Sequence, residues 1–167
     1  MAFAMYERMA QSAADLVTSF VDLDRRRQLG SLSQDELSRL QEMRDQLELA
    51  IGTVRPLGVE RREAIRVCTR LQVLVTWDAA RDLARAHDLS EGGLFLQTSH
   101  PSEPGTPVEL ELQDLRGRPL CLEGTVVWVR LEADGTGDPG MGIRFRNLDD
   151  WDRTVLAELV EAALRAL

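Results

Sequence analysis

The sequence predicts an α+β protein in which an α-helical hairpin precedes a small β-barrel, and a C-terminal helix closes that barrel. Three observations carry this prediction. Apolar residues recur at helical spacing over the first 55 positions, largely alternate over residues 71–145, and return to helical spacing after residue 150. Several short strands separated by regular turn signals are typical of a small barrel.

Composition narrows the class of protein. The chain has 167 residues, of which 44% are hydrophobic and 29% charged, enough for one compact domain with an extension. No apolar run approaches the roughly 20 residues that span a bilayer, and no basic stretch followed by an apolar run marks a signal peptide. We therefore expect a cytoplasmic protein without membrane insertion.

The charge of the chain bears on its partners. The formal net charge is −8, which argues against a broad DNA-binding or anionic-membrane surface, because phosphate backbones select for basic faces. The chain contains no lysine, so its strong bases are all arginines. Any bound anion must therefore be held by a local arginine cluster that works against the overall charge.

The only two cysteines, Cys68 and Cys121, fall in segments predicted to be strands. A disulfide between them is one alternative. Two buried free thiols are favoured, because cytosolic proteins keep thiols reduced and free cysteine is commonly buried.

The N-terminal segment, residues 1–55, predicts two helices. Residues 3–28 lack Gly and Pro, and Gly30 is a natural helix stop. Ser33 and Glu36 form a capping box for a second helix from Gln34 to about Ile51. The first helix places these apolar residues near one face: Met5, Met9, Leu16, Phe20 and Leu23.

The apolar stripe of this hairpin must be covered by something. A coiled-coil-like homodimer interface is favoured, and the alternative is a hairpin folded onto its own C-terminal domain. Pro56 and Gly58 mark a linker at residues 56–60, so the barrel domain is predicted at residues 61–167.

Strands are predicted at residues 71–77, 94–98, 108–112, 120–130 and 141–145. Residues 78–88 favour helix by propensity, but a barrel needs a strand near Leu83 to Leu89, so a strand is expected there. Asp149 or Asp150 should cap the final helix. The tryptophans Trp77, Trp128 and Trp151 are interpreted as core or core-edge residues.

Two short motifs flank the first strand. Arg62 and Arg66 form an RxxxR pair, and Asp88, Ser90 and Gly93 form a DxSxxG pattern. Each alone has a simpler explanation: the arginines as a solvated face, and the second motif as a turn that Asp and Ser cap.

Together and in this order, the two motifs resemble the PilZ family. The resemblance covers roughly residues 60–160 and extends to the segments 88–96, 124–129 and 140–145, while the helical section lies outside it. It implies a six-stranded antiparallel barrel with a C-terminal helix. It also implies a bacterial second-messenger ligand, cyclic di-GMP.

The resemblance assigns roles residue by residue. Arg62 and Arg66 would contact guanine and phosphate, because a guanidinium binds either bidentately and also stacks on purines. Asp88 would accept from guanine N1 and N2, Ser90 would bond a phosphate or base edge, and Gly93 would let the ligand approach the backbone. Arg61 is a further candidate for a second stacked ligand. The expected ligand-binding set is Arg61, Arg62, Arg66, Asp88, Ser90, Gly92 and Gly93.

The sequence therefore predicts a cyclic di-GMP receptor that signals by reorienting its helical extension toward a downstream protein. No catalytic constellation and no metal-ligand spacing is visible, so neither enzyme activity nor a cofactor is expected. The alternative is a ligand-independent PilZ-fold adaptor that acts through protein contacts of the hairpin.

Overall fold

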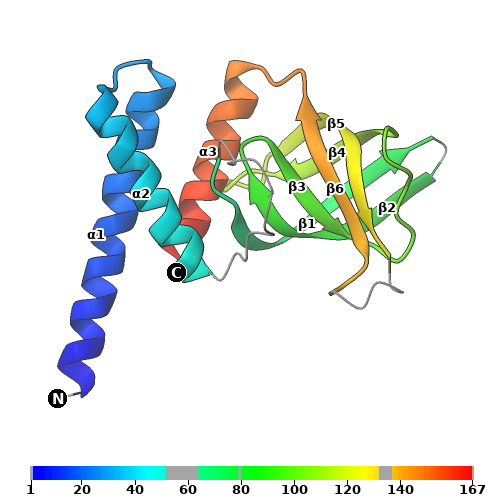
Figure 1. Ribbon diagram of the computed structural model, residues 1–167. Coiled ribbons are helices and arrows are strands. Elements are labelled where there is room, and N and C mark those ends of the chain that lie inside the picture. Colours follow the sequence, from blue (N-terminus) through cyan, green and yellow to red (C-terminus); the bar gives the residue numbers. More distant parts are fainter. Residues whose placement is uncertain (1, 52–63, 79, 132–136, 167) are drawn as a thin grey trace. The chain divides into compact units, whose positions relative to one another are not determined.

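The computed structural model describes residues 2–51, 64–78, 80–131 and 137–166, with side chains from residue 13 onward (Figure 1). The chain divides into two compact units, one holding the two N-terminal helices and the other holding the barrel with nearly all of the C-terminal helix. The predicted linker at residues 56–60 and the predicted domain start at residue 61 lie outside the described residues. None of the described helices is long and apolar enough to cross a membrane.

The N-terminal unit is a hairpin of α1 (Ala2–Gln28) and α2 (Gln34–Ile51), which pack against each other. As predicted, the first helix stops at Gly30, whose φ is 68°. The Gly30 N–H donates to the Arg27 carbonyl at 2.9 Å and the Ser31 N–H to the Arg26 carbonyl at 3.0 Å. These are the two bonds of a Schellman motif, which satisfies the last carbonyls of a helix.

The start of α2 confirms the predicted capping box. The Ser33 N–H donates to the Glu36 carboxylate at 2.9 Å, and the Glu36 N–H donates to the Ser33 hydroxyl at 3.3 Å. Arg26 of α1 lies 2.6 Å from the same carboxylate. Hydrogen bonds from the Ser33 backbone and hydroxyl, then the bond from Arg26, hold the pKa of Glu36 below its ordinary value. One carboxylate thus joins the end of α1 to the beginning of α2.

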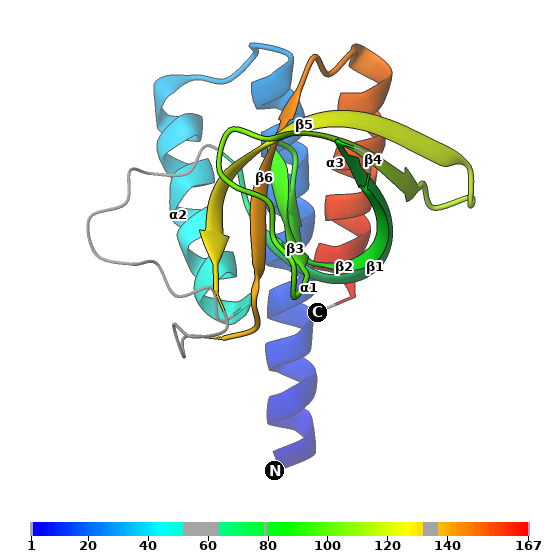
Figure 2. The same ribbon diagram turned by 90° about the vertical axis from the view of Figure 1, so that its right-hand side faces the viewer.

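The second unit is a closed six-stranded antiparallel barrel, as the sequence predicted (Figures 1 and 2). Around the ring the strand order is β1-β2-β3-β6-β5-β4, so the only neighbours that are not hairpins are β3 with β6 and β1 with β4. The strands are β1 (Val67–Trp77), β2 (Ala80–Ser90), β3 (Gly93–Gln97), β4 (Pro107–Gln113), β5 (Pro119–Arg130) and β6 (Gly140–Arg146).

Alternation along each strand fills the interior. In β4, for example, Val108, Leu110 and Leu112 are buried, while Glu109 and Glu111 are exposed. The final helix, α3 (Asp150–Arg165), presents a buried apolar side made of Val155, Leu156, Leu159 and Val160.

Asp149 caps α3 by a reciprocal pair of bonds. Its carboxylate accepts the Asp152 N–H at 2.8 Å, and the Asp152 carboxylate accepts the Asp149 N–H at 3.1 Å. Of the two cap candidates in the sequence, Asp149 is therefore the cap.

The strand expected near Leu83 to Leu89 is present as β2, despite its helical propensity. It pairs with β1 on one side and β3 on the other, and its inward residues Ala84 and Ala86 are small and buried. Two ladders of backbone hydrogen bonds therefore override the local preference of the segment.

The expectation for the cysteines is half wrong. Cys68 and Cys121 are free, as favoured, but both are exposed rather than buried. The strand alternation explains this, since Leu120 and Leu122 point into the barrel and leave Cys121 on the outer face.

The turn between β4 and β5 is organised around Asp114, which is only 7% exposed. Its carboxylate accepts the N–H groups of Arg116 and Arg118, both at 2.8 Å, and the Arg118 Nε–H at 2.6 Å. Gly117 supplies the positive φ, 77°, that the turn requires. The guanidinium of Arg118 lies 5.9 Å from the ring centroid of Trp151 at the start of α3.

These donors also set the acidity of Asp114. Desolvation raises the pKa of the carboxyl, but the hydrogen bonds from the Arg118 backbone, the Arg118 side chain and the Arg116 backbone outweigh it. The pKa is therefore held below its ordinary value.

Candidate ligand-binding site

The fold brings together parts of the two sequence motifs. Arg66 immediately precedes β1, and Asp88 lies near the end of β2. An Arg66 guanidinium nitrogen lies 3.5 Å from Asp88 Oδ1, with the two side chains 25% and 24% exposed. This separation is long for a charge-assisted hydrogen bond, so the pair is loose and partly open to solvent. Arg61 and Arg62 lie outside the described residues.

A β-bulge determines where Asp88 points. Because Ala84 and Ala86 point inward, simple alternation would also carry Asp88 into the core. Between Ala86 and Asp88 the β2–β3 register shifts, and His87 is the extra residue. The phase of the strand therefore changes, so that Leu89 is buried and Asp88 emerges. Bulges are used in this way to re-aim side chains at functional sites.

Asp88 also holds the neighbouring strand. Its Oδ1 accepts the N–H of Phe95 in β3 at 3.2 Å, in addition to its contact with Arg66. Oδ2 has no hydrogen-bond partner among the described residues, so this carboxylate retains acceptor capacity on the outer face of the barrel.

Ser90 and Gly93 have structural roles in the β2–β3 turn. Ser90 is 5% exposed, and its hydroxyl donates to the Gly93 carbonyl at 3.1 Å. A Cβ on Gly93 would lie 2.2 Å from the Ile143 carbonyl oxygen of β6, so the close approach of β3 and β6 requires glycine here. Gly92 is exposed, and a Cβ on it would meet open space. That Ser90, Gly92 and Gly93 contact a ligand stays a prediction.

A cross-strand row extends from Asp88 over the outer face. Asp88 lies opposite Phe95 of β3, Phe95 opposite Gly142 of β6, and Gly142 opposite Trp128 of β5. A second register shift, between Val126 and Trp128, places the indole in this row. Two bulges thus flank the β3–β6 pair and align a carboxylate with two aromatic rings.

The two rings stack across the glycine. Their centroids are 5.0 Å apart and their planes differ by 7°. A Cβ on Gly142 would lie 2.0 Å from Trp128 Nε1, so the missing side chain makes room for the indole. The guanidinium of Arg130 lies 4.9 Å from the Phe95 centroid and 5.6 Å from that of Trp128, within the range of a cation–π interaction.

From the sequence alone, Trp128 was interpreted as a core or core-edge residue, and Phe95, Trp128 and Arg130 were not expected to form a group. The available signal was the pair Gly140 and Gly142, because two glycines at the outward positions of one strand leave room for rings from its neighbours.

A profile of the PilZ domain matches residues 60–162, well over half of the chain. The chain belongs to the PilZ family. Its barrel and both motifs lie within the matched range, whereas α1 and α2 precede it. None of the curated proteins searched matches the chain.

Solved PilZ structures resemble the barrel. The PilZ domain of Escherichia coli YcgR with c-di-GMP is 20% identical, with a TM-score of 0.52, covering 64% of this chain and 94% of that one. The YcgR complex with c-di-GMP is 18% identical, with a TM-score of 0.54, covering 65% and 48%. Bacillus subtilis MotI, an inhibitor of motility, is 15% identical, with a TM-score of 0.53, covering 65% and 51%. The aligned part of this chain spans about half the length of the latter two proteins, so these similarities establish the fold.

Among the described residues, no group of three His, Cys, Asp or Glu side chains is arranged to hold a metal ion. The outer face of the PilZ barrel instead offers two guanidinium groups, from Arg66 and Arg130, one carboxylate from Asp88, and the partly exposed indole of Trp128, which stacks on the buried ring of Phe95. This set is chemically suited to a ligand that combines anionic groups with planar bases.

Proposed function

We propose that this PilZ domain is a receptor for cyclic di-GMP and acts by binding rather than by catalysis. The observation that carries the proposal is the contact between Arg66 of the RxxxR motif and Asp88 of the DxSxxG motif, at 3.5 Å. Two segments 22 residues apart in sequence thereby form one site. Solved PilZ proteins with c-di-GMP share the fold and support the choice of ligand.

The chemistry of the ligand complements the residues of this site. Cyclic di-GMP carries two phosphates and two guanines, whose O6 and N7 accept bidentate bonds from a guanidinium. Oδ2 of Asp88, which has no partner in the part of the chain that the structure describes, would accept from guanine N1 and N2. Arg66 would exchange its long contact with Asp88 for a phosphate or a guanine edge, and Arg61 and Arg62 would contribute further contacts.

The cross-strand row through Phe95, Gly142 and Trp128 would extend the site from β2 toward β5. Trp128 is half-buried and lies in the same cross-strand row as Asp88, so a guanine held by Asp88 would find the open part of the indole beside it. Stacking on aromatic side chains contributes about 1–3 kcal/mol per base in nucleic-acid complexes. Arg130 lies over this surface and adds a cation in a chain of net charge −8.

Signal transmission would pass through the segment that carries Arg61 and Arg62, because it lies between α2 and β1 in the chain. Ligand binding would order these arginines against the barrel and reorient the helical extension, which we propose to be a homodimer interface. Small-angle scattering and hydrogen exchange of α1 and α2 at saturating ligand would then both change. Unchanged profiles in both measurements would contradict this transmission step but not ligand binding.

The binding proposal is tested by calorimetric titration of cyclic di-GMP into the full chain and three variants. Asp88→Asn keeps an oxygen for the Phe95 N–H and removes the charge that guanine donors would recognise. Arg66→Ala removes the guanidinium that lies 3.5 Å from Asp88. Arg153→Ala removes an exposed arginine of α3 and serves as the matched control.

We expect measurable binding by the wild type, with losses of about 10- to 100-fold for Asp88→Asn and for Arg66→Ala, and no loss for the control. Absence of binding by a folded wild type would overturn the receptor proposal. Function would then be sought in the adaptor role, through the partner of the helical hairpin.

A further inference from the structure

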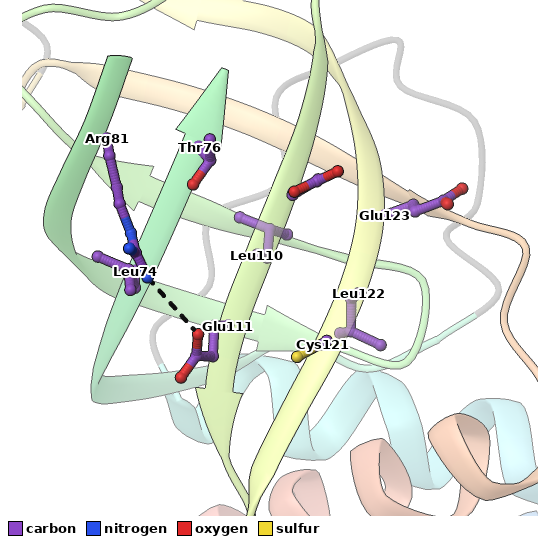
Figure 3. Close-up of a pocket in the computed structure, with 9 residues that line it drawn as sticks. Leu74, Thr76, Arg81, Leu110, Glu111, Cys121, Leu122 and Glu123 are labelled. Atoms are coloured by element: carbon purple, nitrogen blue, oxygen red, sulfur yellow. Dashed lines mark ion pairs between the residues drawn. The ribbon is translucent and has the colours of Figure 1, made fainter. Parts of the chain in front are cut away.

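A shallow groove of about 640 Å³ lies on a different part of the barrel, across the outer faces of β1, β4 and β5 (Figure 3). Most of its outward side chains come from three adjacent strands and form two cross-strand rows, and Arg81 of β2 lines it as well. The first row contains Leu74, Glu111 and Cys121, and the second contains Thr76, Glu109 and Glu123.

The first row is partly apolar and partly open to solvent, because Leu74 is half-buried and Cys121 is exposed. Leu74 lies opposite Leu83 of β2, and Leu83 is 60% exposed. Cys121 continues this surface on the far side of Glu111 and is also exposed. When a partner covers neighbouring leucines on the solvent face of a strand pair, the burial of their apolar surface is favourable in free energy.

The second row is strongly acidic. Glu109 lies directly opposite Glu123, and like charges at such positions repel each other. On its other side Glu123 lies opposite Arg146 of β6 and accepts a hydrogen bond from the Asn147 amide at 2.7 Å, so Glu109 is the less compensated of the two. The only cation among the lining residues is Arg81, whose guanidinium lies 3.9 Å from Glu111, with side chains 64% and 49% exposed. A pair so long and so exposed compensates little of this negative charge.

The groove is remote from the candidate ligand site along the same two strands. Arg66 and Asp88 lie where Val67 pairs with Leu89, whereas the groove lies toward the other end, where Trp77 pairs with Ala80. The two surfaces can therefore be occupied at the same time.

From the exposed Leu83, the half-buried Leu74 beside it and the only partly compensated acidic row together, we propose that this groove docks an extended segment of a partner protein, in which arginine or lysine side chains flank an apolar one. The apolar side chain would cover Leu74 and Leu83. The cations would lie between Glu109 and Glu123 and relieve their repulsion. This inference does not depend on cyclic di-GMP binding.

The test uses a fluorescein-labelled pentapeptide of alternating arginine and leucine as the probe, titrated against the full chain. Fluorescence anisotropy gives the affinity, and amide chemical shifts of ¹⁵N-labelled protein give the location. Two further peptides serve as controls, one with serine in place of leucine and one with glutamate in place of arginine. We expect shifts confined to β1, β4 and β5 around the groove, and weaker binding of both control peptides.

Two double variants separate the groove from general attraction to an acidic protein. Glu109→Gln with Glu123→Gln removes two groove charges, and Glu103→Gln with Glu158→Gln removes two exposed charges elsewhere. We expect the first pair to weaken probe binding about 3- to 20-fold, and the second to leave it unchanged. Leu83→Ser should weaken it without changing the charge.

Three results would overturn the proposal. One is equal loss in the two double variants, another is equal binding of the serine peptide, and the third is a pattern of shifts spread over the whole barrel surface. Each would reduce the interaction to non-specific attraction between a basic peptide and an acidic protein.

Discussion

The β4–β5 and β2–β3 hairpins each contain an aspartate that contacts an arginine, yet the two carboxylates are used differently. Asp114 is nearly buried and accepts three hydrogen bonds of 2.6–2.8 Å from its own turn. Asp88 is a quarter exposed, accepts one backbone N–H at 3.2 Å, and lies 3.5 Å from Arg66. The first carboxylate is saturated by the fold, whereas the second keeps acceptor capacity for another molecule.

The two hairpins thus distinguish a carboxylate that stabilises the fold from one that keeps acceptor capacity. A carboxylate whose donors are short and local stabilises a turn, so its replacement should affect folding. A carboxylate that a bulge turns outward toward a loosely held guanidinium contributes little to stability, so its replacement should affect binding. The predictions that follow test this distinction, beginning with the largest expected effect.

The largest expected effect on stability comes from one of two neighbouring glycines in the β2–β3 hairpin. In Gly93→Ala the new methyl would lie 2.2 Å from the Ile143 carbonyl oxygen, so β3 and β6 must separate. We expect a loss of more than about 3 kcal/mol in the free energy of unfolding. The neighbouring Gly92→Ala meets open space and should stay within about 0.5 kcal/mol of the wild type. Urea unfolding of both variants measures this, and equal stabilities would refute the close-approach explanation.

Replacement of Asp114, whose carboxylate is saturated with hydrogen bonds, should have the next largest effect on stability. Asp114→Ala leaves the N–H groups of Arg116 and Arg118 without their acceptor in a turn that also positions Arg118 near Trp151. We expect the Tm to fall by roughly 5–10 °C, with cyclic di-GMP binding unchanged well below that temperature. Scanning calorimetry and titration of the same sample would check both halves.

Replacement of Asp88, whose carboxylate keeps acceptor capacity, should instead spare stability and weaken ligand binding. Asp88→Asn retains an acceptor for the Phe95 N–H, so its free energy of unfolding should change by less than about 1 kcal/mol. The variant should nevertheless lose ligand affinity, as proposed above. If it instead unfolds as readily as the Asp114 variant, the distinction between the two hairpins is wrong.

The smallest expected effect is on how stability depends on pH. The ordinary pKa of this carboxyl is near 3.8, and in the folded protein the pKa of Asp114 lies below that value. The stability that the ionised carboxylate contributes is therefore fully present above pH 3.8 and disappears as the pH falls through the folded pKa. The stability difference between the wild type and Asp114→Asn should therefore be constant from pH 7 to about pH 5 and shrink below about pH 4. Thermal unfolding of both proteins across this pH range tests the sign. A stability difference that grows as the pH falls would contradict the prediction.

The sequence allowed much of the fold to be predicted, because alternation and capping are local signals. The Ser33 and Glu36 box, the stop at Gly30 and five of the six strands follow from residue type and spacing, whereas β2 was expected only because a barrel needs a strand there. The burial of the cysteines was predicted wrongly because residue preference was placed above strand parity. Leu120 and Leu122 already assign Cys121 to the outer face.

The site was less accessible to prediction, for a different physical reason. Extrapolated alternation from Ala84 and Ala86 would bury Asp88, and only the bulge at His87 reverses that outcome. A bulge depends on how three strands pair, which no single segment encodes. The proximity of Arg66 and Asp88 was therefore predicted only through the family resemblance, and the row through Phe95, Gly142 and Trp128 was missed.

The two exposed thiols have a practical consequence. Cys68 lies opposite Asp88 in the β1–β2 ladder, and Cys121 lies within the acidic groove, so each of the two proposed surfaces already carries a natural attachment point. With no other cysteine in the chain, Cys68→Ser or Cys121→Ser leaves one thiol for a maleimide dye. A dye on Cys68 would report occupancy of the ligand face, and a dye on Cys121 that of the groove, without any engineered residue in either surface.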